Sequence, residues 1–303
     1  MRPTSRLRQL LKLDSPLILP GIYDALSAHI ATQAGAQALY LSGSSVAASL
    51  LGKPDVGLTT LTDMTDVARR IALSTDLPVV ADADTGYGNA LNVMHTVRSY
   101  EAAGLAGMHM EDQVSPKKCG HFAGKELIST AEMVSKIRAA LDARRDPDFL
   151  IIARTDARSV NGLSDAIARA VAYAGAGADG IFVEAPHAQD EYTAIARALP
   201  DTLLVADVTE GGKSPALGAE AYYALGFRMV FFSASALRAT MQTLDRLYRR
   251  IVTERTTSTS LDIIIGFEER NRILGLEGVY EVEQKYATAP AVRQTGSCKE
   301  GDE

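Results

Sequence analysis

The sequence predicts a single α/β domain of the (β/α)8-barrel (TIM barrel) class. Eight short apolar segments recur along the 303 residues, and a stretch with helical spacing follows each of them. The segments fall at 17–20, 38–42, 78–81, 107–110, 149–153, 180–183, 203–206 and 229–232. Continuous apolar runs of this length fit strands buried on both faces of a parallel sheet. A doubly wound open sheet would give the same alternation, so the polar residues at the strand ends must discriminate between the two architectures.

Glycines mark the joints at which a predicted helix ends just before the next apolar segment, as is common at helix C-termini. They include Gly35, Gly104, Gly177 and Gly226. Residues 236–253 predict the eighth helix, and residues from about 263 to 286 predict one or two further helices beyond the barrel. Residues 287–303 are small, polar and charged, and we expect a mobile tail there. The single domain is therefore expected to span residues 1–286.

Composition and charge exclude several classes of partner. The net charge is −6 and no run of Lys or Arg exceeds two residues, which argues against nucleic acid. No apolar run approaches the ~18 residues that span a bilayer, and the first 13 residues do not resemble a secretory signal. The two cysteines, Cys119 and Cys298, are not spaced like a disulfide framework or a zinc site. We therefore expect a cytoplasmic protein that binds neither nucleic acid nor membrane.

Acidic residues follow the predicted strands, at the end of the barrel where enzymes of this fold carry their active sites. Asp82 and Asp84 follow the third strand, and Glu111 ends the fourth. Such oxygen ligands suit Mg2+, with Mn2+ as an alternative, because Mg2+ keeps several waters and needs only one or two carboxylates. A single strand-end acid often caps the next helix or faces solvent. Three acids on adjacent strands favour a metal site.

Arg154 ends the fifth strand, where its guanidinium could hold a substrate carboxylate in a bidentate manner. A salt bridge to Asp156 or Glu184 is the alternative. The glycine-rich stretch 84–89 lacks the spacing of a phosphate-binding or dinucleotide-binding motif and predicts a tight turn.

Cys119 lies in a polar loop, within the segment 117–121 (KKCGH). We expect the two lysines and His121 to lower the pKa of the thiol and to make it reactive or a good proton donor. A lone cysteine in a loop is more often inert, so the surrounding strand ends carry the argument for catalysis.

At these residues the sequence resembles the isocitrate lyase and phosphoenolpyruvate mutase superfamily, and within it the methylisocitrate lyase, dimethylmalate lyase and petal-death-protein group. The similarity covers about residues 15–286. The matching segments are 40–43, 54–57, 82–88, 109–113, 117–121, 153–156 and 268–271. The resemblance implies a Mg2+-dependent carbon–carbon lyase, acting on a small carboxylate, that forms a homotetramer with C-terminal helices exchanged between subunits.

The resemblance also implies roles for individual side chains. The residues implied to hold Mg2+ are Asp82 and Asp84, with Asp55 and Glu111 acting through outer contacts. The implied catalytic residues are Cys119 as proton donor to the departing half of the substrate, His121 beside it, and Tyr40 as the base. The implied substrate-binding residues are Ser42, Gly43, Ser44, Gly120, Arg154, Glu184, Asp207, Ser233, Arg238 and Arg270.

Three departures from the family pattern bear on the substrate. The loop continues as 122–126 (FAGKE), which is closer to the dimethylmalate and petal-death type than to methylisocitrate lyases. Asp207 stands where the family usually has Asn, and it would repel an anionic substrate unless it is protonated or paired. Ser233 stands where many lyases have Tyr, and it resembles the oxaloacetate acetylhydrolases.

The expected reaction is cleavage of a 2-hydroxy polycarboxylate, 2-methylisocitrate or a 2-alkylmalate, to pyruvate and a second acid such as succinate. Hydrolysis or decarboxylation of oxaloacetate at the same site is the first alternative. A barrel that binds a carboxylate without catalysis is the second.

Overall fold

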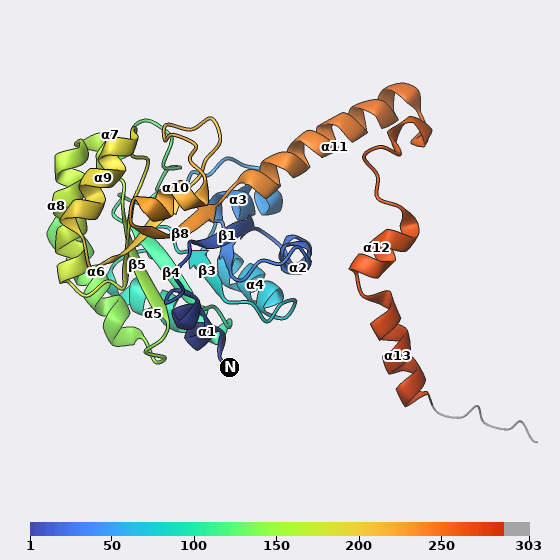
Figure 1. Ribbon diagram of the computed structural model, residues 1–303, viewed down its shortest axis with the longest axis horizontal. Helices are drawn as coiled ribbons and strands as arrows, with labels where there is room; N and C mark the ends of the chain where they lie inside the picture. Colours follow the sequence, from blue (N-terminus) through green and yellow to red (C-terminus); the bar gives the residue numbers. More distant parts are fainter. Residues whose placement is uncertain (288–303) are drawn as a thin grey trace, which may run out of the picture. The chain divides into compact units, whose positions relative to one another are not determined.

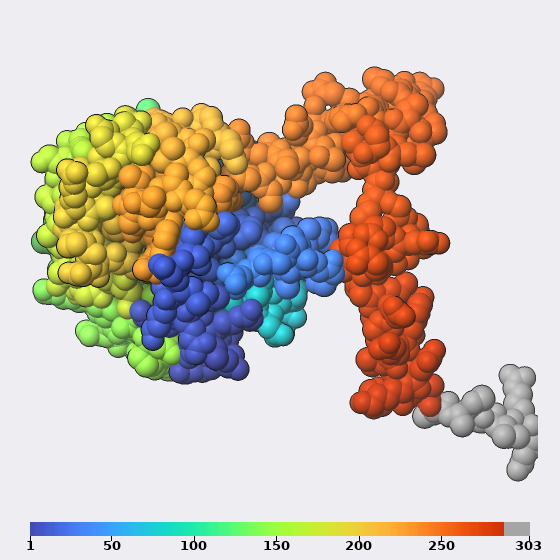
Figure 2. Space-filling model, in the orientation of Figure 1, coloured from blue at the N-terminus to red at the C-terminus, as the bar shows by residue number. Residues whose placement is uncertain are grey.

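The eight strands form one closed, parallel barrel in the order in which they occur along the chain (Figure 1). The computed structural model describes residues 1–287, and all eight strands lie in its first unit, Met1–Gln242. The strands are β1 (Leu17–Ile22), β2 (Leu39–Leu41), β3 (Val79–Asp82), β4 (Gly107–Glu111), β5 (Leu150–Thr155), β6 (Gly180–Val183), β7 (Leu203–Asp207) and β8 (Phe227–Phe232). Each overlaps one predicted segment. Because β1 pairs with β8, the barrel prediction is confirmed and the open sheet is excluded. The N-terminal residues of this unit, in blue, and its C-terminal residues, in orange, lie side by side (Figure 2).

Helices follow the strands as predicted. They are α2 (Ala25–Gln33), α3 (Gly43–Leu51), α4 (Leu61–Ala72), α5 (Ala90–Ala102), α6 (Thr130–Ala143), α7 (Ala157–Val160), α8 (Leu163–Gly175), α9 (Gln189–Ala198), α10 (Ala219–Ala224) and α11 (Ser235–Glu254). At the joints before β2, β4, β6 and β8 the glycines predicted from the sequence take a positive φ of 90–101°. That backbone region suits glycine, and it lets the chain turn at once from helix into strand.

One helix was not predicted from the sequence. Helix α1 (Pro3–Leu10) precedes the first strand, and its Leu7 is fully buried among the inward-facing side chains of the barrel. This helix therefore closes the amino-terminal end of the barrel, opposite the expected active site.

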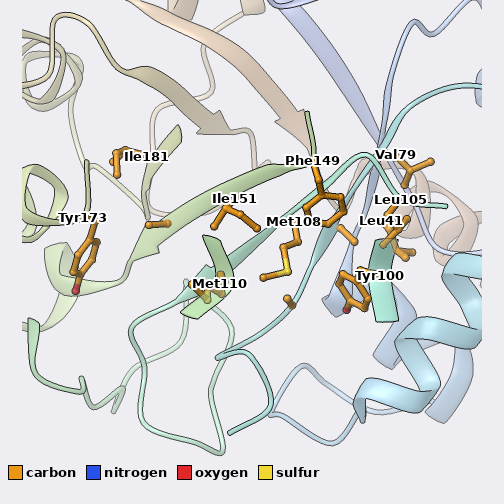
Figure 3. Packing of buried hydrophobic residues seen from close by; sticks show 14 of the residues in the cluster. Leu41, Val79, Tyr100, Leu105, Met108, Met110, Phe149, Ile151, Tyr173 and Ile181 are labelled. Atoms are coloured by element: carbon orange, nitrogen blue, oxygen red, sulfur yellow. The ribbon is translucent and has the colours of Figure 1, made fainter. Parts of the chain in front are cut away.

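Side chains alternate along each strand between two apolar clusters. Outward-facing residues pack against the helices, and Figure 3 shows Met108 and Ile151, register partners on β4 and β5, within this outer cluster. Inward-facing residues fill the barrel; they include Tyr40, Val80, Ile152, Phe182, Val205 and Phe231. Continuous apolar runs were expected for this reason, since both faces of the sheet are buried.

The inward positions continue beyond the apolar part of each strand. Two residues after the inner-cluster members just listed stand Ser42, Asp82, Arg154, Glu184, Asp207 and Ser233. Because successive side chains of a strand point to opposite faces, these polar residues project into the mouth of the barrel. The two-residue repeat of side chains along each strand therefore places the polar residues of the site at the mouth of the barrel.

The second unit begins at Thr243. It contains the end of α11, a short 3-10 helix (Ser258–Ser260), α12 (Phe267–Ile273) and α13 (Leu276–Tyr286), so the predicted helices beyond the barrel are present. The predicted tail, with Cys298, lies outside the described residues except for residue 287. Among residues 1–287 no helix is long and apolar enough to cross a membrane.

Candidate active site

A cavity of about 80 Å3 lies at the carboxyl ends of the strands. It is lined by twelve of the seventeen predicted site residues: Tyr40, Ser42, Ser44, Asp55, Asp82, Cys119, Gly120, His121, Arg154, Glu184, Asp207 and Ser233. Phe182, Thr209 and Ala234 complete the lining and were not predicted. The strand period would have found Phe182, which is the inward residue before Glu184.

Lys117 is buried against two of the predicted metal-site acids. Its Nζ lies 2.8 Å from a carboxylate oxygen of Asp55 and 3.0 Å from Oδ1 of Asp84. Burial opposes its charge, but Asp84, Asp82 and the other acids nearby hold the pKa of Lys117 well above its usual value. Burial also raises the pKa of Asp84 to about 7, against the attraction of Lys117. The ammonium therefore neutralises acids, and the expectation that it activates Cys119 is wrong.

Asp82 offers a carboxylate oxygen to the cavity. Its Oδ1 accepts a hydrogen bond from the backbone N–H of Asp84 at 2.9 Å, and its Oδ2 faces Gly43. A Cβ on Gly43 would lie 2.6 Å from this Oδ2, so the glycine keeps the space beside it open. Burial raises the pKa of Asp82, but His109, Lys117 and Arg154 outweigh this and lower it, which favours the ionised ligand.

These donors fit Mg2+. Within residues 1–287 no three His, Cys, Asp or Glu side chains are arranged around one metal position. Mg2+ does not require such a cluster, because it binds through one or two carboxylates and retains water. Asp82 would be the direct protein ligand, with Asp84 and Asp55 close behind. Glu111 does not line the cavity; it is fully buried between Gln113, at 2.8 Å, and Arg154, at 3.3 Å.

Arg154 is held by carboxylates of the protein. Its Nε and Nη2 donate to the two oxygens of Asp156 at 3.0 and 3.1 Å, and Nη2 lies 3.6 Å from Glu184 Oε2. The salt bridges considered as the alternative are thus present. Nη1 makes no hydrogen bond within residues 1–287, and Arg154 lines the cavity, so one edge of the guanidinium remains open to a ligand.

The loop that carries Cys119 is fastened to the barrel. Lys125 Nζ donates to Asp156 Oδ1 at 2.7 Å and also to the carbonyl of Gly120, and the Cys119 N–H donates to the carbonyl of Asp55 at 3.1 Å. A Cβ on Gly120 would lie 2.0 Å from Glu184 Oε1, so only glycine lets the loop lie so close to this acid. Lys125 was not predicted, because nothing in the sequence shows that this loop residue reaches Asp156.

The thiol of Cys119 is half-buried at the cavity wall. Burial raises its pKa, and the hydrogen bond from the His121 backbone offsets only part of this effect. The predicted lowering of the thiol pKa is therefore wrong. His121 is not a charged neighbour either, because burial lowers its pKa; its Nδ1 accepts from the Lys213 N–H at 3.2 Å. A protonated thiol suits a proton donor better than a nucleophile.

Tyr40 forms a hydrogen bond of 2.8 Å with Nε2 of His109. Burial, then Asp82 and Asp207, raise the pKa of Tyr40 well above 10, and burial lowers the pKa of His109 to about 4. Both rings are therefore neutral, which does not favour the predicted role of Tyr40 as a base. His109 was missed as a site residue, although it is the inward residue before Glu111.

Two predicted arginines do not line the cavity. Arg238 is half exposed and donates to Glu210, at 3.1 Å to Oε2, which is the physical reason that it does not reach the site. Arg270 lies in the second unit, on α12, so its role stays a prediction.

An enzyme acting on small carboxylic acids is the class that this barrel and its cavity define. A carboxylate that could hold Mg2+, a protonated thiol and a buried guanidinium line the same small space.

Comparison with known proteins names the family. Residues 7–252 match the family described as phosphoenolpyruvate phosphomutase. The 2,3-dimethylmalate lyase of Eubacterium barkeri is 43% identical over 95% of this chain and 99% of that protein. A probable 2-methylisocitrate lyase of Corynebacterium glutamicum is 45% identical over 85% of this chain and 83% of that protein.

Solved structures of proteins with related activities also resemble this chain. An oxaloacetate acetylhydrolase with the inhibitor 3,3-difluorooxalacetate has a TM-score of 0.89 and 35% identity, over 94% of this chain and 98% of that chain. A phosphonopyruvate hydrolase with oxalate and Mg2+ has a TM-score of 0.85 and 31% identity, over 94% of this chain and 99% of that chain. The chain therefore belongs to the phosphoenolpyruvate mutase/isocitrate lyase superfamily, and it is a carbon–carbon lyase of that superfamily acting on a carboxylic acid.

Proposed function

We propose that this lyase cleaves a 2-hydroxy polycarboxylate, of the 2-alkylmalate or 2-methylisocitrate type, to pyruvate and a second carboxylic acid. The observation that carries the proposal is the position of Cys119. Its protonated thiol lines the same cavity as Asp82 and Arg154, so it can deliver a proton to a carbanion generated between them.

The chemistry follows from these positions. The substrate hydroxyl gives its proton to solvent, and the bond between the hydroxyl-bearing carbon and its neighbour breaks. The hydroxyl-bearing carbon becomes the carbonyl carbon of pyruvate, and the electron pair of the broken bond passes to the departing half as an enediolate. Cys119 then transfers its proton to that carbon, which completes the new C–H bond. The open edge of Arg154 and the hydroxyls of Ser42 and Ser44 would hold the carboxylate of the pyruvate half. The fastened loop keeps water away from the anion.

Mg2+, with Mn2+ as an alternative, would be held by Asp82, supported by Asp84, Asp55 and Glu111. When bound, it supplies positive charge that stabilises the oxygen anion of the pyruvate half. The phosphonopyruvate hydrolase that resembles this chain was solved with oxalate and Mg2+, which supports the same ion here.

The substrate test compares three acids. We expect release of pyruvate from 2,3-dimethylmalate or 2-methylisocitrate, measured by a coupled reduction of pyruvate, and no oxalate from oxaloacetate. Absence of turnover of both hydroxy acids, at saturating Mg2+, would contradict the proposal.

Oxaloacetate hydrolysis or decarboxylation is the second candidate. One observation favours it: Ser233, the residue that resembles the acetylhydrolases, lines the cavity and donates to Asp207 at 3.0 Å. The oxaloacetate acetylhydrolase structure resembles this chain closely. Release of oxalate in the same panel would select this function.

Removal of the metal should abolish turnover. We expect EDTA to stop pyruvate release and Mg2+ to restore it. In Asp82→Asn the Mg2+ concentration for half-maximal rate should rise at least about 10–100-fold, the loss that even an outer-shell change can cause. Asp66→Asn, on the exposed face of α4, is the matched control and should titrate like the wild type. Full activity of the wild type in excess EDTA would rule out the metal.

We also propose that the enzyme is a cytoplasmic homotetramer whose helices α12 and α13 pack on another subunit. Large apolar side chains of this unit, such as Phe267 and Tyr286, are exposed within the single chain. Sedimentation of the full chain tests the assembly.

A further inference from the structure

The cavity has an acidic wall that the proposed chemistry leaves unused. Glu184 follows β6 and Asp207 ends β7, and both line the cavity. Asp82 and Cys119, which the proposed reaction uses, belong to β3 and to the loop after β4. Glu184 and Asp207 are therefore acids of the cavity lining to which the proposed reaction gives no role.

Asp207 presents one carboxylate oxygen without a partner. Its Oδ2 accepts hydrogen bonds from the hydroxyls of Thr209 and Ser233, each at 3.0 Å. Its Oδ1 is buried and has no hydrogen-bond partner within residues 1–287. A buried oxygen of this kind is costly unless a ligand or water satisfies it.

This wall is compensated only in part: Arg154 lies 3.6 Å from Glu184, and no ion pair to Asp207 is present within residues 1–287. Arg154 is already paired with Asp156, and Lys125 shares the same Asp156 carboxylate. Burial keeps His121 neutral, and Lys117 is paired with Asp55 and Asp84. A substrate carboxylate placed against Glu184 and Asp207 would meet like charge in a buried site.

The cavity is also small. Its volume of about 80 Å3 corresponds to roughly two or three waters of the liquid. Neither 2,3-dimethylmalate nor 2-methylisocitrate fits a space of this size, so the volume does not discriminate between them, and the charge of the wall carries the inference.

We propose that Asp207 sets the substrate class of this site: it accepts a hydrogen bond from an uncharged group of the substrate and excludes a third carboxylate. The inference rests on the proposed function and narrows it. The substrate is then a dicarboxylate of the 2-alkylmalate kind, and tricarboxylates such as 2-methylisocitrate are poor ligands.

The test measures binding, so that it does not depend on turnover. In a Cys119→Ser background with Mg2+, calorimetry gives the dissociation constants of 2,3-dimethylmalate and 2-methylisocitrate. We expect the dicarboxylate to bind at least about tenfold more tightly, and Asp207→Asn to reduce this ratio at least about tenfold, mainly by improving binding of the tricarboxylate. Asparagine keeps the shape and removes the charge.

Glu210→Gln is the matched control. Glu210 is an acid three residues beyond Asp207, paired with Arg238 outside the cavity, so its removal should leave the ratio unchanged. Tighter binding of 2-methylisocitrate by the wild type, no binding of either acid, or an unchanged ratio in Asp207→Asn would overturn the inference. Failure of the proposed function has a different signature, namely binding of these acids without cleavage when Cys119 is present.

A pH series gives a second readout. Burial and the charge of Glu184 raise the pKa of Asp207 to about 6, against the hydroxyls of Ser233 and Thr209 and the charge of Arg154. The other titratable groups that interact with Asp207 are Tyr40, Tyr222 and His121, all neutral. Burial also raises the pKa of Glu184, but this acid titrates in both proteins. Below about pH 6 the wild type should therefore lose discrimination, and its ratio should approach that of Asp207→Asn, in which Asp207 no longer titrates. Parallel profiles for the two proteins would contradict the assignment.

Discussion

Cys119→Ser should lower kcat for cleavage of the hydroxy acid by about 10²–10⁴-fold, the usual contribution of a positioned general acid. A serine hydroxyl keeps the size of the thiol but holds its proton far more tightly. KM should change little, because Cys119 acts on the departing carbon and the carboxylates are held elsewhere. The measurement is steady-state release of pyruvate, combined with calorimetric binding of oxalate in Mg2+, which should be unaffected.

The pH profile adds an independent check on the same thiol. Because burial raises the pKa of Cys119, the wild type should keep its proton donor, and its kcat, into the alkaline range where an ordinary thiol ionises. Cys298→Ser is the control for cysteine removal and should retain full activity. Turnover by Cys119→Ser within about threefold of the wild type would leave less effect than a general acid supplies.

Much of the fold could be predicted because the strand runs are continuous and apolar. Such runs arise when both faces of a strand are buried, and each one here became a barrel strand. Helix α1 could not be predicted so easily, because its role depends on Leu7 reaching the open end of a barrel that later residues build. The glycines with positive φ before four of the strands could be predicted, because that backbone conformation favours glycine over other residues.

The site was predicted where the strand period determines it. Asp82, Arg154 and Glu184 each stand one inward position beyond an apolar barrel residue. Their partners could not be predicted, because partner choice depends on loops returning across the barrel mouth. Lys117 forms salt bridges with acids and does not pair with the thiol, and Lys125 forms a salt bridge with Asp156. The expectation for the thiol pKa was wrong for this reason: a lysine that is close to Cys119 in the sequence directs its charge to other residues in the structure.

Asp156 is fully buried between two cations, so its removal should have a large effect on stability. Its oxygens accept from Nε and Nη2 of Arg154 at 3.0 and 3.1 Å and from Nζ of Lys125 at 2.7 Å. Burial opposes its ionisation, but Arg154 and Lys125 hold the pKa of Asp156 well below its usual value. The carboxylate therefore joins the substrate-facing arginine of β5 to the loop that carries Cys119.

Asp156→Ala should lower the free energy of unfolding by about 3–5 kcal/mol, because it leaves buried cations uncompensated. For a unit of this size that is a fall in Tm of roughly 6–20 °C, measured by circular dichroism. The sign with pH follows from the lowered pKa: the stabilisation is complete above the unfolded pKa of about 4 and is lost as the pH falls toward the folded value. The difference in stability between the wild type and the variant should therefore shrink in acid.

Asp165→Ala, which breaks a partly exposed ion pair with Arg169, should cost only about 0–1 kcal/mol. Equal losses for the two variants would mean that Asp156 holds no more than a surface acid does, and that the loop is fastened to the barrel by other contacts.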